Sequence, residues 1–70
     1  MISVILPVFN EGENIAKQLK EIENTVTINH EVLVVYDFDE DDTIPPVKEL
    51  QKKHRNILLV KNIFGRGVIN

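Results

Sequence analysis

Three apolar runs along the chain have the length and composition of buried β-strands. They cover residues 2–8, 31–36 and 56–61, and each is rich in Val, Ile and Leu with little polar alternation. Such continuous runs are typical of strands covered on both faces, as in a parallel sheet. Pro7 lies at the end of the first run, where its missing N–H disturbs a sheet least. The pattern therefore predicts three parallel strands.

Between the first two runs the apolar residues recur at helical spacing, which predicts a helix over about residues 12–24. Asn10 followed by Glu13 resembles a capping box at its start. A second, shorter helix is expected after Thr43, which we assign as its N-cap, with an end near His54. Pro45 is compatible with a first helical turn. The apolar stripe of the first helix consists of Ile15, Leu19, Ile22 and Val26.

The resulting order is β-α-β-α-β. Short connections and right-handed crossovers then favour an α/β fold, a parallel three-layer sandwich. Ligands of such sheets bind at the carboxyl ends of the strands. The loops PVFNEGE, DFDEDDT and FGRG follow the three strands and hold the unusual residues of the chain. We therefore expect any functional site at this edge.

Composition narrows the function classes. The net charge of −3, without a basic stripe, argues against a nucleic-acid partner. The chain has no cysteine, which fits a reducing compartment, and no apolar run near the roughly 20 residues that span a bilayer. We expect a cytoplasmic location, which for a full-length enzyme includes the cytoplasmic face of the membrane. With 70 residues, the chain is one domain or part of one.

The three motifs, taken in order, resemble the opening of a family 2 glycosyltransferase. They are SVILPVFNEGENI, VVYDFDEDDT and NIFGRGVIN, and they resemble most the dolichol-phosphate or polyprenyl-phosphate sugar transferases. The resemblance implies the nucleotide-binding first half of a GT-A (Rossmann-like) fold. Residues 1–70 would then be a partial nucleotide-sugar-binding domain, the N-terminal part of a glycosyltransferase domain.

The resemblance also implies roles for individual residues. Two would wall the nucleobase, two carboxylates would face the base or ribose, and the last turn would lie near the base and phosphates. In chain order these nucleotide-binding residues are Pro7, Phe9, Glu11, Asp37, Gly65 and Arg66. The second loop departs from the family pattern: Tyr36 replaces the first Asp of a usual pair, Phe38 replaces Gly, and Asp39 stands where Ser is usual.

The family's metal-binding Asp-x-Asp, catalytic base and acceptor site lie further along its sequences. We therefore expect no catalytic and no metal-binding residue within residues 1–70, so this fragment alone would be inactive. By resemblance, the full-length enzyme uses Mg²⁺ or Mn²⁺ and a UDP- or GDP-linked sugar, with a lipid phosphate as a candidate acceptor.

Other interpretations of the acidic loop stay open at this stage. Asp37-Phe38-Asp39 after an apolar strand resembles a haloacid-dehalogenase-like phosphatase fragment with Asp37 as nucleophile, although the motif's Thr is replaced by Asp41. A calcium loop is rejected, because it requires Gly and Glu where this chain has Asp42 and Lys48. A receiver-like magnesium pocket would need an acid near the first strand, where Glu11 is the candidate.

Two structural interpretations complete the set. Glu40, Asp41 and Asp42 are expected to form a solvated acidic turn that favours the following helix. The chain could also be a non-catalytic truncated domain that self-associates through an open sheet edge at the third strand.

Overall fold

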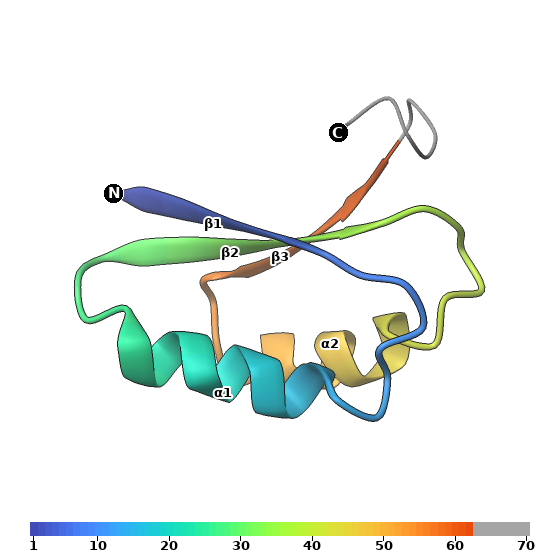
Figure 1. The fold of residues 1–70 in the computed structure, drawn as a ribbon, viewed down its shortest axis with the longest axis horizontal. Coiled ribbons are helices and arrows are strands. Elements are labelled where there is room, and N and C mark those ends of the chain that lie inside the picture. The colour runs from blue at the N-terminus through green and yellow to red at the C-terminus, as the bar shows by residue number, and fades with distance from the viewer. Residues whose placement is uncertain (63–70) are drawn as a thin grey trace.

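The structure of the chain is a computed structural model, and it describes residues 1–62. Strands and helices alternate as the sequence predicts (Figure 1). The elements are β1 (Ile2–Pro7), α1 (Ile15–Thr25), β2 (His30–Tyr36), α2 (Ile44–Gln51) and β3 (Ile57–Lys61). Gly65 and Arg66 lie outside the described residues, so the structure does not place them.

The three strands form one parallel sheet in the order β1-β2-β3. The expected α/β fold with a parallel sheet is confirmed. Both helices lie on the same face of the sheet (Figure 1), as crossovers of one hand between consecutive neighbours require. Residues 1–62 therefore supply two layers of the expected three-layer sandwich.

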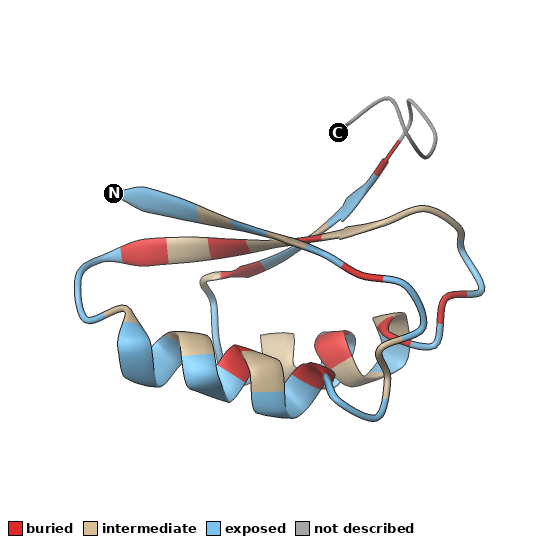
Figure 2. Cartoon of the chain, viewed as in Figure 1, coloured by how far each residue is buried: buried red, intermediate tan, exposed pale blue. Residues whose placement is uncertain are grey.

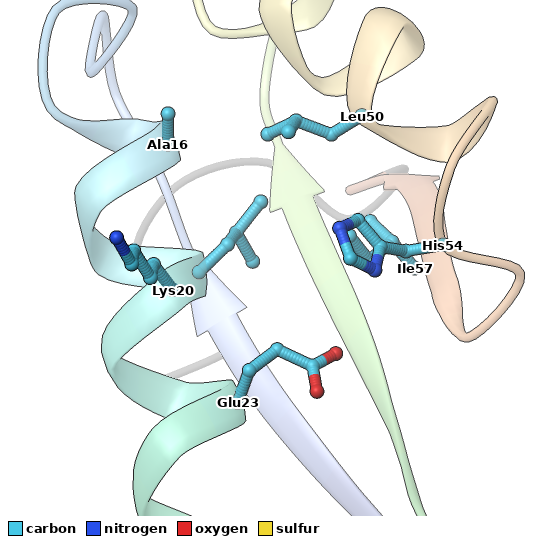
Figure 3. Close-up of a pocket in the computed structure, with 7 residues that line it drawn as sticks. Ala16, Lys20, Glu23, Leu50, His54 and Ile57 are labelled. Carbon is cyan, nitrogen blue, oxygen red and sulfur yellow. The ribbon is translucent and has the colours of Figure 1, made fainter.

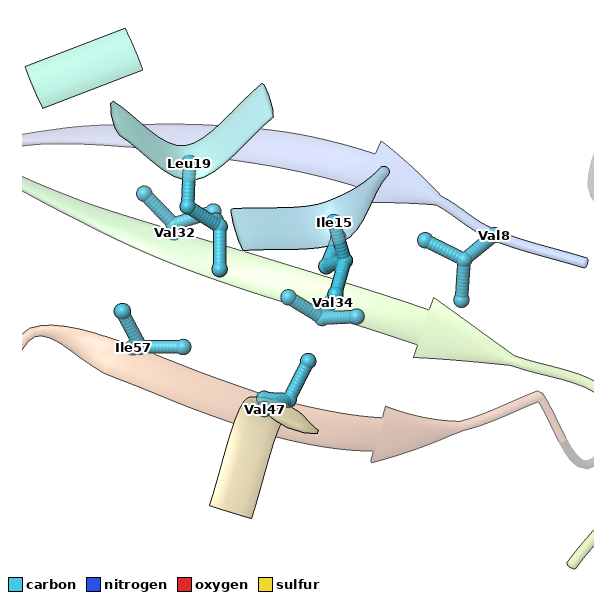
Figure 4. Packing of buried hydrophobic residues seen from close by; sticks show 7 residues of the cluster. All are labelled: Val8, Ile15, Leu19, Val32, Val34, Val47 and Ile57. Atoms are coloured by element: carbon cyan, nitrogen blue, oxygen red, sulfur yellow. The ribbon is translucent and has the colours of Figure 1, made fainter. Parts of the chain in front are cut away.

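The core lies between the sheet and the two helices. Val32 and Val34 of β2 point toward the helices and are almost fully buried, as are Ile15 of α1 and Val47 of α2 (Figure 4). Ile15 and Leu19 of the apolar stripe predicted for α1 thus belong to this core, and Ile22 is partly buried against it. The complete buried cluster is Val8, Ile15, Leu19, Val32, Val34, Val47 and Ile57.

The other face of the sheet is apolar but uncovered within residues 1–62. The register aligns Ile5 with Leu33 and Leu33 with Leu58 across all three strands. Ile5 remains 54% exposed and Leu58 42% exposed, and exposed and half-buried segments dominate β1 in Figure 2. The sequence predicted strands buried on both faces. Within the described residues, only the face that carries the helices is buried.

The first helix begins later than predicted. It starts at Ile15 rather than Gly12, and its N-cap Asn14 makes no side-chain capping bond. The expected capping box is wrong, because Asn10 adopts a left-handed backbone conformation with φ 50° and bonds to a distant loop instead. Residues 10–12 thus precede α1, to which the Glu11 carbonyl is bonded through the N–H groups of Asn14 and Ile15, and they belong to the carboxyl edge of the sheet.

Candidate functional site

The loops that follow β1 and β2 are joined at the carboxyl edge by hydrogen bonds to Asp41. The backbone N–H of Asn10 donates to both carboxylate oxygens, at 3.1 and 3.2 Å, and the N–H of Thr43 donates to Oδ1 at 2.8 Å. The Asp41 side chain is only 2% exposed. A buried carboxylate needs such donors, since burial of an unpaired charge is strongly unfavourable.

Three further bonds extend the connection. The N–H of Glu11 donates to the Thr43 hydroxyl at 2.8 Å, and the N–H of Gly12 donates to Asp42 Oδ1 at 2.9 Å. In return the N–H of Asp42 donates to Asn10 Oδ1 at 3.3 Å. We call residues 10–12 and 41–43 together the loop clasp. The clasp engages three consecutive N–H groups of the first loop with side chains of the second.

Gly12 is required by the closeness of the two loops. A Cβ built on Gly12 would lie 2.6 Å from the backbone oxygen of Asp42 and 3.1 Å from the Cγ of the same residue. Real Cβ atoms do not approach a backbone oxygen so closely, so any side chain here must push the loops apart. Asn10 suits its own place for a different reason, since Asn adopts positive φ more readily than most residues.

The pKa of Asp41 lies below its ordinary value of 3.8. Burial by itself would raise the pKa, but hydrogen bonds from the Thr43 hydroxyl and N–H and from the Asn10 N–H stabilise the charged form and together outweigh it. Asp41 therefore stays ionised at neutral pH as the centre of the clasp.

These contacts correct two of the sequence-based predictions. Asp41 is a buried structural acid rather than part of a solvated turn, whereas Glu40 is exposed as expected. Thr43 precedes α2 as its N-cap, but its side chain makes no capping bond to that helix and accepts a bond from Glu11 instead. The polar residues repeated in both loops were a sequence signal for hydrogen bonding. Neither loop alone shows which residue of the other loop each of them bonds to.

The aromatic part of the predicted site also joins the two loops. The rings of Phe9 and Phe38 have centroids 5.7 Å apart and planes tilted by 57°. Phe9 remains 47% exposed, and Phe38 is half-buried. Pro7 is exposed at the end of β1, where its backbone pairs with Val35. Pro7 and Phe9 therefore lie at the edge where the sequence placed them.

The predicted carboxylates have separate surroundings. Asp37 Oδ1 accepts a bond from the Asn62 side-chain amide at 3.0 Å, and the N–H of Asn62 donates to Tyr36 at 2.7 Å. Glu11 Oε1 accepts a longer bond, 3.4 Å, from Gln18. Asn62 was absent from the predicted site residues, although its position directly after the third strand was a usable signal. The end of β3 thus orients Asp37.

Asp39 is engaged in a surface ion pair with Lys61 at 2.9 Å. The hydrogen bond and the charge of Asp39 raise the pKa of Lys61 above its ordinary value. Both side chains are well exposed, so we attribute little stability to the pair. It does place the tip of the acidic loop beside the end of β3.

A groove of about 390 Å³ lies elsewhere, between α1 and α2 (Figure 3). Leu19, Leu50 and Ile57 form its apolar part, with Lys20, Glu23 and His54 around it. It is on the helix side of the molecule and not at the carboxyl edge, so we attach no part of the site to it. Neither helix within residues 1–62 has the length and apolar character that spanning a membrane requires.

The carboxyl edge thus carries an aromatic pair and an oriented carboxylate above a hydrogen-bonded clasp, and the family comparison agrees with the motifs that form it. The family model described as glycosyl transferase family 2 matches residues 3–70. The chain belongs to this family. Because the match spans the acidic loop itself, it favours the glycosyltransferase interpretation of this loop over the phosphatase one.

Relatives of this family 2 chain include named transferases. Dolichol-phosphate mannosyltransferase of Pyrococcus furiosus is 37% identical over 54 residues, covering 76% of this chain and 15% of the relative. An uncharacterized glycosyltransferase of Haemophilus influenzae is 29% identical, covering 100% of this chain and 22% of the relative.

A Methanococcus voltae relative covers 99% of this chain and 25% of its own length at 40% identity. Its name is dolichyl N-acetyl-alpha-D-glucosaminyl phosphate 3-beta-D-2,3-diacetamido-2,3-dideoxy-beta-D-glucuronosyltransferase. The family 2 chain spans about a quarter or less of the length of these relatives. No solved structure matches it.

Proposed function

We propose that this chain is the nucleotide-binding part of an enzyme that transfers a sugar from a UDP- or GDP-linked donor. Family 2 membership over residues 3–70 supports glycosyl transfer in general. The observation that carries the finer proposal is the position of Asp37. It follows β2 directly, at the carboxyl edge where parallel sheets bind ligands, and Asn62 holds its carboxylate in place.

The residues at this edge have the chemistry that a nucleoside requires. The Phe9 ring offers an apolar plane on which a base can stack, and such stacking is tolerant of base identity. Asp37 can accept hydrogen bonds from a base N–H or a ribose hydroxyl. Pro7 adds an apolar wall beside Phe9, and Glu11 is a further carboxylate on the same loop. Gly65 and Arg66 would approach the phosphates, a role suited to an Arg side chain.

The acceptor and the metal belong to the same proposal. The printed names of two relatives include dolichol phosphate or a dolichyl phosphate sugar, which supports a lipid phosphate as the acceptor of the complete enzyme. Mg²⁺ or Mn²⁺ would neutralise the donor diphosphate there. Among residues 1–62, no group of three or more His, Asp or Glu side chains is arranged to hold a metal ion.

Asp37→Asn is expected to weaken nucleotide binding about tenfold or more, since a hydrogen bond to a charged group contributes about 1.5–3 kcal/mol. UDP and GDP would each be titrated into the isotope-labelled chain and followed by NMR. In the unmodified chain the amide signals of Phe9, Asp37 and Asn62 should shift. Glu40→Gln removes an exposed charge from the same loop and serves as the control, with unchanged affinity.

Absence of shifts at the carboxyl edge with either nucleotide would reject the proposed function. The phosphatase alternative makes an opposite prediction for the same chain. There, beryllofluoride with Mg²⁺ should bind at Asp37 and should fail to bind to Asp37→Asn, without any requirement for nucleotide.

A second candidate property is self-association, which we propose on the basis of the uncovered sheet face. Ile5, Leu33 and Leu58 form an aligned apolar row there, and β1 and β3 are the sheet edges within residues 1–62. We expect light scattering to show an apparent mass that rises with concentration. Leu58→Lys should lower that mass, whereas Asn24→Lys, which adds the same charge at an exposed position of α1, should not. A monodisperse monomer at all concentrations would contradict this expectation.

A further inference from the structure

Phe38 is the residue of the acidic loop that nucleotide chemistry alone does not explain. It lies between two acids, yet its ring is half-buried and contacts Phe9 from the neighbouring loop. A centroid separation of 5.7 Å with tilted planes is within the preferred range for aromatic pairs. An aromatic side chain is therefore packed against the proposed base-stacking ring.

The backbone fixes both members of this pair. The N–H of Asp41 donates to the carbonyl of Phe38 at 3.2 Å, which closes a turn over residues 38–41. Asp41 in turn accepts two bonds from the N–H of Asn10, the residue next to Phe9. Phe9 thus directly precedes one half of the loop clasp, and Phe38 is bonded through its backbone carbonyl to the other half.

We propose that Phe38 is a positioning residue for nucleotide recognition, which holds the Phe9 ring in the orientation that a nucleobase stacks on. This inference rests on the proposed nucleotide-binding function. A surface Phe side chain can otherwise adopt several rotamers, and fixing one of them on binding is unfavourable. The contact with Phe38 restricts Phe9 before the ligand arrives, so the ligand meets a preorganised surface.

The proposal predicts a loss of nucleotide affinity that passes through Phe9. Phe38→Leu keeps an apolar side chain but removes the ring, and should weaken binding of UDP or GDP about two- to tenfold, the range expected from the strength of one aromatic pair. Phe38→Tyr keeps the ring and should restore the affinity of the unmodified chain.

A double-mutant cycle tests whether Phe38 acts through Phe9. Binding of UDP and GDP would be measured by NMR titration for the unmodified chain, Phe38→Leu, Phe9→Leu and the double variant. If the proposal holds, Phe38→Leu has no further effect once Phe9 is Leu, so the two effects are strongly non-additive. Thermal melts of each variant, together with unchanged amide signals of Asn10 and Asp41, establish that the clasp is intact.

The outcomes separate this inference from the function on which it rests. No nucleotide binding by the unmodified chain would overturn both. Binding that Phe38→Leu leaves unchanged would overturn the role of Phe38 alone. Additive effects in the cycle would also overturn it, because they would show that Phe38 contributes independently of the Phe9 ring.

Discussion

Asp41→Asn is expected to lower the free energy of unfolding by about 2–4 kcal/mol, because the loss of charge weakens several hydrogen bonds at a buried site. The carboxylate accepts bonds from the N–H groups of Asn10 and Thr43. An amide of the same size would have to point its NH₂ group toward one of these donors. A chain of 70 residues has a total free energy of unfolding of roughly 4–10 kcal/mol, so the variant should lose a large part of its stability. Urea denaturation followed by circular dichroism measures the change.

Glu40→Gln is the matched control, because it removes one exposed negative charge from the adjacent position. It should change stability by less than about 0.5 kcal/mol, as surface substitutions usually do. The low pKa of folded Asp41 adds a dependence on pH. The stabilisation of the fold by the ionised Asp41 carboxylate is complete above the unfolded pKa of 3.8. It is lost as the pH falls below that value toward the lower folded pKa. Equal stability of Asp41→Asn and Glu40→Gln would show that the clasp does not depend on this charge.

Gly12→Ala is expected to destabilise the fold by about 1–3 kcal/mol, the usual range for forcing extra volume into a packed site. The added Cβ would meet the Asp42 backbone oxygen at 2.6 Å. Relief requires separation of the loops, and that separation would strain the bonds from Glu11 to Thr43 and from Gly12 to Asp42. Loss of thermal stability and of NMR signal dispersion in both loops would report the effect.

Two variants make the test of Gly12 specific. Glu13→Ala changes the next residue, which is exposed, and should have little effect. Gly12→Ala combined with Asp42→Ala should not regain stability, because the nearest atom to the added Cβ is backbone oxygen and remains in place. Recovery in the double variant would instead assign the clash to the Asp42 side chain.

Together these variants distinguish the framework of the site from its ligand contacts. Asp41 and Gly12 belong to the clasp, so their substitution should reduce stability and binding together. Asp37 bonds to Asn62 at the end of β3 and lies outside the clasp. Its substitution should affect nucleotide affinity far more than the melting temperature.

The sequence by itself determined the element order and the edge of the sheet at which we propose the site. Continuous Val, Ile and Leu runs and the helical spacing of Ile15 and Leu19 are local patterns, and each one reports directly which side chains seek burial. Parallel pairing then placed Phe9 and Asp37 at the same edge, since the carboxyl ends of parallel strands lie together. Family motifs in the same loops added the expected chemistry.

Only the tertiary structure decided which polar groups in those loops are structural. Asn10 and Asp41 are separated by 31 residues, and spacing within either loop contains no information about their bond. Rules that use only neighbouring residues therefore predicted Asn10 as a helix cap and Asp41 as a solvent-exposed residue. Folding brought the two loops together and buried Asp41. Its carboxylate is bonded to the N–H groups of Asn10 and Thr43, because an unpaired buried charge is too unfavourable to persist.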